Sequence, residues 1–219
     1  MSWLEFSVAM IVFLASHRIP MMFGIKPRII HLFGQRGYTI LFSLFSTAVL
    51  LWVIWAAGRA PWVPLWDQTQ ASRWAVNIIM PLVIILASFG IAAPNPFAFE
   101  GRKVGFDPDH PGIVGVTRQP LLWALLLWSG AHLWANGDLA HVILFGIFAV
   151  FSAMGMMIAE RRADRTLASR TALVPFWALI SGKWRPIKSP VLSRLAIAGI
   201  VWAGLYLSHS TVIGVLPTP

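Results

Sequence analysis

The chain has 219 residues, of which 58% are hydrophobic and only 11% are charged, and its mean hydropathy is +0.72. Soluble domains carry about 25% charged residues, so this composition excludes an ordinary cytosolic domain. The net charge of +9 comes from 17 Lys and Arg against 8 Asp and Glu, and the absence of cysteine excludes disulfides, thiolate-ligated metals and covalently attached c-type haem.

Six apolar segments follow one another along the chain. The first, residues 3–25, contains only Glu5, His17 and Arg18 as ionisable residues and lacks the cleavage site of a secretory signal, so we interpret it as a retained helix. The others contain no Asp, Glu, Lys or Arg and cover residues 38–57, 74–93, 119–137, 139–159 and 195–219. Because about 20 apolar residues cross a bilayer, the sequence predicts an all-α bundle of about six transmembrane helices. We expect a single membrane domain over residues 1–219.

The basic residues between these segments predict the orientation of the bundle. Fifteen of the 17 belong to the first, third and fifth connections, and only Arg59 and Arg73 fall on the opposite side. Since basic residues are enriched in cytoplasmic loops, both termini are expected outside the cytoplasm. Attraction to anionic membrane lipids explains a positive charge distributed in this way. Binding of nucleic acid, which needs a basic patch on one element, is not expected.

Four histidines fall within the apolar segments, where an ionisable side chain needs a partner and marks a functional site; they are His17, His132, His141 and His209. The last three are expected near one side of the membrane. However, the sequence has no zinc-binding motif, so a dedicated zinc site is not predicted. His31 and His110 fall in connections, where solvation accounts for them.

Helical spacing places two of these histidines on apolar faces. His17 shares a face with the apolar set Phe6, Met10 and Phe13, and His132 shares one with the set Leu121, Leu125, Trp128 and Asn136. An apolar wall around a neutral imidazole suits an axial ligand of haem iron. The alternative is a histidine that only hydrogen-bonds a neighbouring helix.

Two polar segments flank these helices. Residues 136–138 (Asn-Gly-Asp) predict a tight turn, with Asp138 capping the next helix. On the side expected to face the cytoplasm, a polar mouth is predicted from the set Asp107, Asp109, His110, Arg118 and Glu160. Glu160 is expected within a solvated, mutually paired charge run. The short apolar segment 173–180 is expected to lie in the membrane interface.

Five motifs, in order along nearly the whole chain, resemble the NnrU family: RGY at 36–38, APWVPLWD at 60–67, PNP at 94–96, TRQP at 117–120 and AHLWANGD at 131–138. That family includes bacterial proteins associated with denitrification and nitric oxide metabolism. It is similar to the plant and cyanobacterial zeta-carotene isomerases, which are membrane proteins that hold haem b. The resemblance implies a haem b protein of the bacterial inner membrane.

The resemblance places the two important histidines of the isomerase at His17 and His132, as catalytic residues and as ligands of the haem iron. The wider cofactor-binding set that we predict adds His209, Arg18, Arg118 and Asn136. The predicted topology puts His17 and His132 toward opposite ends of their helices, at depths that differ by roughly 10 Å or more. Pairing of His132 with His209 is therefore a second assignment.

The resemblance implies cis–trans isomerisation of a hydrophobic small molecule, an apolar polyene such as zeta-carotene. One alternative is a non-catalytic haem or accessory protein in nitric oxide metabolism. Another is a membrane methyltransferase, because residues 118–120 and Glu160 also resemble the Arg-His-Pro and acidic motifs of isoprenylcysteine-type methyltransferases. The NnrU family often has Arg-His-Pro where this chain has Gln119, which hydrogen-bonds but neither titrates nor ligates haem well.

Overall fold

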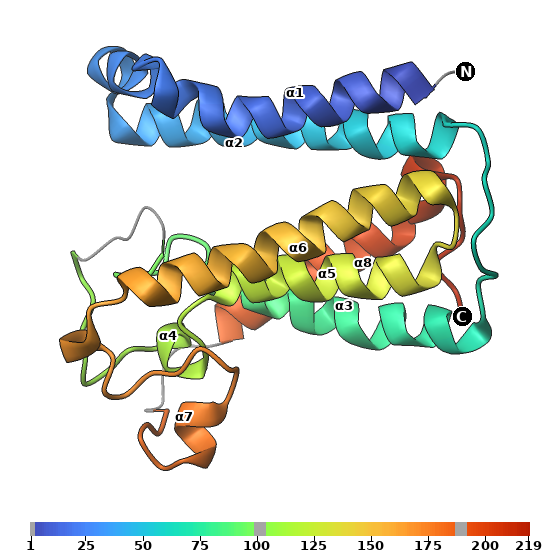
Figure 1. The fold of residues 1–219 in the computed structure, drawn as a ribbon. Coiled ribbons are helices and arrows are strands. Elements are labelled where there is room, and N and C mark those ends of the chain that lie inside the picture. The colour runs from blue at the N-terminus through green and yellow to red at the C-terminus, as the bar shows by residue number, and fades with distance from the viewer. Residues whose placement is uncertain (1–2, 99–103, 187–191) are drawn as a thin grey trace. The chain divides into compact units, whose positions relative to one another are not determined.

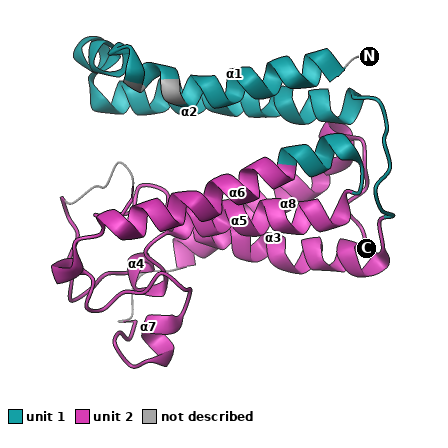
Figure 2. Cartoon of the chain, viewed as in Figure 1, with its two compact units in different colours: residues 1–67, 137–144 teal, residues 68–136, 145–219 magenta. Residues whose placement is uncertain are grey.

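The computed structural model describes residues 3–98, 104–186 and 192–219, apart from the side chains of Arg18 and Met21. Within these ranges the regular secondary structure is helical and no strand forms (Figure 1), which confirms the all-α prediction. The chain divides into two compact units, residues 1–67 with 137–144 and residues 68–136 with 145–219 (Figure 2). Three basic residues that contribute to the predicted orientation, Arg102, Lys103 and Lys188, lie outside the described residues.

The first unit contains a hairpin of two helices, α1 (Trp3–Met22) and α2 (Ile25–Arg59), which pack along each other. The turn between them requires Gly24, whose φ of 63° lies in the left-handed region that glycine adopts at little cost. The buried face of α1 includes Phe6, Met10 and Phe13, as helical spacing predicts. The basic connection after the first span is itself helical, and it is interrupted by the non-helical backbone of Gly34 (φ 71°, ψ 170°).

The second unit is organised around α3 (Gln70–Gly90), which packs against both α5 (Pro120–Ala135) and α8 (Leu192–Ile213). A further helix, α6 (Leu139–Arg162), belongs to the first unit as far as residue 144 and to the second unit from residue 145 (Figure 2). The apolar segment 139–159 is therefore divided between the two units.

Both ends of α3 are fixed by side chains. At its start, Thr69 and Ser72 form a capping box in which each hydroxyl oxygen accepts the backbone N–H of the other residue at 3.1 Å. At its end, Nη1 of Arg194 in α8 donates to the carbonyl oxygens of Ser88 and Phe89, at 2.8 and 3.1 Å. These bonds satisfy backbone groups that a helix end leaves without an intrahelical partner.

Short elements connect the long helices of the second unit. They are α4 (Ile113–Val116), a 3₁₀ turn at Arg165–Leu167 and α7 (Trp177–Ile180). The Trp184 ring packs on Gly115 of α4 so closely that a Cβ at Gly115 would lie 2.6 Å from the ring. This contact holds the segment after α7 against α4.

Among the described residues, four helices are long and apolar enough to cross a membrane: α2, α3, α6 and α8. Two shorter apolar helices accompany them, Trp3–His17 and Pro120–Ala135. With 16 residues, α5 extends about 24 Å, somewhat less than a hydrocarbon core of about 30 Å. Each of the predicted apolar segments thus lies largely within a helix, and the described helices are those of an integral membrane protein.

Candidate functional site

His17 lies among aromatic rings of α1 and α2, within the first unit. Its ring centroid is 4.5 Å from that of Phe13 and 5.3 Å from that of Phe42. Nδ1 lies 2.8 Å from the carbonyl oxygen of Phe13, and Nε2 lies 3.1 Å from the hydroxyl of Ser46. Because a carbonyl oxygen only accepts, Nδ1 carries the ring proton and Nε2 keeps the lone pair to which the Ser46 hydroxyl donates.

An apolar cavity of about 470 Å³ lies between α1 and α2. Its wall includes Ser16, Tyr38, Phe42 and Phe45, and Phe42 is also in contact with the His17 ring. Small-molecule sites commonly have volumes of about 300–1,000 Å³ and mostly apolar walls with a few polar groups. The cavity therefore has the size and the chemistry to accept an apolar ligand next to His17.

His132 lies near the end of α5, in the second unit. Its ring packs against Trp128 and Phe145, with centroids 5.5 and 5.2 Å away, which confirms the face predicted for Trp128 and His132. Nδ1 lies 2.9 Å from the carbonyl oxygen of Trp128, so this ring also carries its proton on Nδ1 and its lone pair on Nε2. Nδ2 of Asn136 donates to the carbonyl oxygen of His132 at 2.8 Å and thereby caps the end of α5.

The two assignments of the haem ligands, His17 with His132 and His132 with His209, differ in the compact units that contribute a histidine. His132 and His209 both belong to the second unit, whereas His17 belongs to the first (Figure 2). Nδ1 of His209 lies 2.7 Å from the carbonyl oxygen of Val215. The side chain of Arg18 lies outside the described residues. Where the structure is described, no group of three or more His, Cys, Asp or Glu side chains is placed to hold a metal ion.

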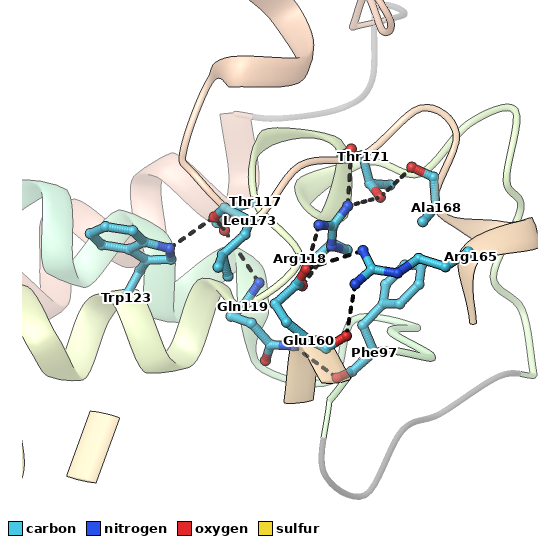
Figure 3. A network of polar contacts seen from close by, with 10 residues as sticks. All are labelled: Phe97, Thr117, Arg118, Gln119, Trp123, Glu160, Arg165, Ala168, Thr171 and Leu173. Carbon is cyan, nitrogen blue, oxygen red and sulfur yellow. Dashed lines mark hydrogen bonds and ion pairs between the residues drawn. The ribbon is translucent and has the colours of Figure 1, made fainter. Parts of the chain in front are cut away.

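Arg118 lies at a buried junction of the second unit, where α5 begins and α6 ends (Figure 3). Its guanidinium binds both carboxylate oxygens of Glu160, with Nε donating to Oε1 at 2.7 Å and Nη2 donating to Oε2 at 2.6 Å. Nη1 donates to the carbonyl and the hydroxyl oxygen of Thr171, at 3.1 and 3.2 Å. Glu160, expected in a solvated charge run, is 15% exposed and forms this ion pair instead.

Further hydrogen bonds fix the backbone around Arg118 (Figure 3). The carbonyl oxygen of Leu173 accepts from Thr117 Oγ1 at 2.7 Å and from Trp123 Nε1 at 2.9 Å. Gln119 donates from Nε2 to the carbonyl oxygen of Phe97 at 2.8 Å. The hydrogen-bonding role expected for Gln119 is thus confirmed, and this amide ties the segment after α3 to the start of α5.

Sequence reasoning placed Arg118 and Glu160 in one polar mouth without pairing them, and it missed Thr171 and Ser46 as partners of Arg118 and His17. Glu160 and Thr171 lie 42 and 53 positions from Arg118, and Ser46 lies 29 positions from His17. Helical periodicity relates only residues of one element, so it does not identify such pairs. The available signal was weaker: Ser46 is a hydroxyl within an apolar segment, and Glu160 is an acid that directly follows one.

A family model described as NnrU protein matches residues 5–217, nearly the whole chain. The chain belongs to the NnrU family. Neither the curated proteins nor the solved structures gave a match. The range that matches the NnrU model contains His17, His132 and the Arg118–Glu160 ion pair.

This NnrU-family chain has a second polar pair, a histidine hydrogen-bonded to an aspartate, at the start of α6. The Nδ1–H of His141 donates to Oδ2 of Asp138 at 2.6 Å, and the two side chains are 19% and 6% exposed. Oδ1 of Asp138 accepts the backbone N–H of His141 at 3.3 Å, which confirms the predicted helix cap. The side chain of Asp138 therefore anchors both the ring and the backbone of His141.

The turn before this pair packs tightly on the segment that follows α2. The carbonyl oxygen of Gly137 accepts the backbone N–H groups of Leu65 and Trp66, at 2.6 and 3.2 Å. A Cβ at Gly137 would overlap the carbonyl oxygen of Trp66. Residues 136–138 form a short connection between α5 and α6, as predicted, but with extended backbone at Asn136 (φ −121°, ψ 98°), and only glycine fits at its centre.

Replacing Asp138 by asparagine is expected to destabilise the protein by about 1–3 kcal/mol at pH 7, because the buried hydrogen bond from His141 loses its charged acceptor. Burial raises the pKa of the Asp138 carboxyl, but the hydrogen bonds and charge of His141 outweigh burial and hold that pKa below its ordinary value. The stabilisation that the Asp138 carboxylate provides is therefore complete above the pKa of an aspartate in the unfolded chain, about 3.9. It is lost as the pH falls through the lower pKa of Asp138 in the folded protein.

Thermal unfolding in detergent between pH 7 and pH 3 measures this effect. The difference in unfolding temperature between the wild type and Asp138→Asn should become smaller as the pH falls through the acid end of the range. Asp107→Asn is the matched control, since Asp107 also binds a histidine three positions later, His110, but at the surface. A difference between wild type and Asp138→Asn that does not change with pH would contradict the assignment.

Proposed function

We propose that this protein binds haem b within the membrane through His132 and His17 and isomerises an apolar polyene of the zeta-carotene type between cis and trans. The observation that supports this most is shared by both imidazoles: each donates its Nδ1 proton to the carbonyl four residues earlier. Histidines that bind a metal usually donate their other ring N–H to a carbonyl or carboxylate, which fixes the ring and its tautomer. Both lone pairs are therefore on Nε2, the nitrogen that would face the iron.

The surroundings of both rings fit a haem group. Phe13 and Phe42 pack on His17, while Trp128 and Phe145 pack on His132, so each imidazole lies in apolar surroundings. Burial in such surroundings is one of the ways in which a protein sets the potential of haem iron. At His17, ligation requires the Ser46 hydroxyl to turn away from Nε2, since it lies 3.1 Å from that atom.

The chain's own residues have three roles in this proposal. When bound, the haem supplies an iron centre that weakens double-bond character in a polyene and so permits rotation. The aromatic side chains exclude water, and the cavity beside His17 offers an apolar wall to the substrate. Asn136 fixes the end of the helix that carries His132. Further cofactor-binding residues in the proposal are Arg18, Arg118 and, as a substitute ligand, His209.

We place the chain in the bacterial inner membrane as a single domain over residues 1–219. It has six transmembrane helices and both termini outside the cytoplasm. The asymmetry of the basic residues supports this orientation. The four long apolar helices and the two shorter ones supply the six spans.

Absorption spectra of the detergent-purified protein, oxidised and reduced, test the two ligands. We expect one haem b per chain in the wild type and loss of most of the haem in His17→Ala and in His132→Ala. The matched control is His31→Ala, which changes an exposed histidine of α2 and should keep the full haem content. Haem retained by both ligand variants would contradict the assignment. Loss in His132→Ala and His209→Ala, with His17→Ala unchanged, would move the site to the second unit.

Product analysis tests the reaction. The protein is co-expressed with a pathway that makes cis zeta-carotene. We expect the wild type to convert this product to the trans isomer and His132→Ala to leave it unconverted. Unchanged cis isomers would contradict isomerisation. An open coordination position without isomerisation would instead favour a haem protein of nitric oxide metabolism. Binding of S-adenosylmethionine without haem would favour a methyltransferase.

A further inference from the structure

A second cavity, of about 390 Å³, lies in the second unit beside the Arg118 network. Its wall contains three cations, Arg118, Arg165 and Lys183, together with the hydroxyl side chains of Ser169 and Thr171. Arg165, Ser169 and Lys183 are exposed, so the cavity reaches the surface of the protein. The haem proposal shares Arg118 with this cavity but places no ligand of the iron in it.

The charges around the cavity are unbalanced. Among the described residues, no Asp or Glu contributes to its wall. The carboxylate of Glu160 lies 2.6 Å from Arg118 and 3.6 Å from Arg165, so two of the three positive charges share a single negative charge. Lys183 has no ion-pair partner in the described part of the chain. The cavity therefore attracts an anion, and two formal positive charges remain to bind it.

The innermost cation is held in a fixed position. Four hydrogen bonds direct the Arg118 guanidinium at Glu160 and Thr171. By contrast, Arg165 is 67% exposed along its side chain, and its closest contact is a hydrogen bond to the backbone carbonyl oxygen of Glu160 at 3.1 Å. Arg118 therefore forms a rigid cationic floor, whereas Arg165 and Lys183 are placed at the opening, where they can close on an incoming anion.

The edge of the cavity is apolar and exposed. Trp177 and Val174 belong to its wall and are 54% and 55% exposed, and Phe176 and Ile180 beside them are 53% and 72% exposed. Tryptophan next to apolar and basic side chains is typical of the membrane–water interface. A ligand at this place meets cations at one end and apolar surface at the other.

We propose that this cavity binds a phosphate group, with Arg165 and Lys183 as its ligands and Ser169 as a hydrogen-bond donor. Arginine and lysine are the usual partners of phosphate oxygens, arginine through a planar fork and lysine as a point charge. The phosphate belongs to an anionic phospholipid headgroup or to a free phosphate ester, which present the same oxygens to the site.

Thermal unfolding of the detergent-purified full chain separates these sources. In one arm, mixed micelles contain dioleoylphosphatidylglycerol or, as a neutral reference, dioleoylphosphatidylcholine. In the other arm, inorganic phosphate is compared with chloride at constant ionic strength. The test variant is the double substitution Arg165→Gln/Lys183→Gln. Its matched control is Arg162→Gln/Arg185→Gln, which removes two exposed charges from the same basic segment but none from the cavity wall.

We expect phosphatidylglycerol to raise the unfolding temperature of the wild type and of the control variant. In the test variant, the affinity for the lipid should fall roughly fivefold for each cation removed. Stabilisation by inorganic phosphate alone, lost in the test variant, would support the site and assign it to a free phosphate ester. Equal losses in the test and control variants would overturn the proposal in favour of nonspecific attraction, as would no stabilisation by either anion. The single variant Lys183→Gln leaves the contacts of Glu160 intact. A loss of affinity for the lipid in this variant therefore shows that the loss in the double variant does not come from a folding defect.

Discussion

Replacing Glu160 by glutamine is expected to lower the free energy of unfolding by about 3–5 kcal/mol, the usual effect of removing one partner from a buried ion pair. The side chains of Arg118 and Glu160 are 9% and 15% exposed, so little water reaches the guanidinium once its counter-charge is gone. Glutamine also turns an amide N–H₂ toward one of the guanidinium nitrogens. For a chain of this size, the unfolding temperature should fall by about 6–20 °C.

Two further variants make this experiment specific. Arg161→Gln removes an exposed charge from the position next to Glu160, and its effect should stay within about 0.5 kcal/mol. The double variant Arg118→Met/Glu160→Leu replaces both partners by apolar side chains and should recover most of the lost stability, because it leaves no buried charge unpaired. Equal small effects of Glu160→Gln and Arg161→Gln would show that the ion pair between Arg118 and Glu160 contributes nothing to the stability of the protein.

Replacing Gly137 by alanine is expected to destabilise the protein by about 2–4 kcal/mol, within the range of effects from strained backbone and lost hydrogen bonds. The added Cβ would overlap the carbonyl oxygen of Trp66, which belongs to the backbone and so moves only with its segment. Moving that segment also weakens the bonds from Leu65 and Trp66 to the Gly137 carbonyl, each worth about 1 kcal/mol.

Gly146, within α6, provides the matched control. A Cβ at this position meets no atom within 4 Å. Alanine is also the better helix former by up to about 1 kcal/mol, so Gly146→Ala should leave the unfolding temperature unchanged or raise it. Circular dichroism or tryptophan fluorescence during heating measures both variants. Similar effects of Gly137→Ala and Gly146→Ala would contradict the role given to the turn.

The helices were largely predictable because hydropathy is a local property. Each long apolar segment became a helix, and the short connection at residues 136–138 was predicted from its residue types, though not its extended backbone. The sequence did not indicate that α2 begins at Ile25. The charged residues Lys26, Arg28 and Arg36 precede the apolar segment 38–57, yet they belong to the same helix. A solvated charged residue destabilises a helix only slightly, so the point where the sequence changes from charged to apolar is not the point where the helix begins.

The candidate site was predictable to the extent that it depends on one helix at a time. The packing of His17 on Phe13 and of His132 on Trp128 follows from helical spacing alone. The ion pair between Arg118 and Glu160 does not, because it depends on how the end of α6 meets the start of α5. Such contacts between elements follow from packing, which residue spacing within one helix does not encode.

The central place of α3 in the second unit also has a consequence for biosynthesis. One of its main partners, α8, begins about a hundred residues after α3 ends. At ~5–20 residues per second, α3 is complete about 5–20 s before that partner exists. Throughout this interval the carbonyl groups of Ser88 and Phe89 lack the guanidinium of Arg194, and lipid or an insertion factor must cover the flank that α8 later occupies. The second unit is thus complete only once α8 has been synthesised.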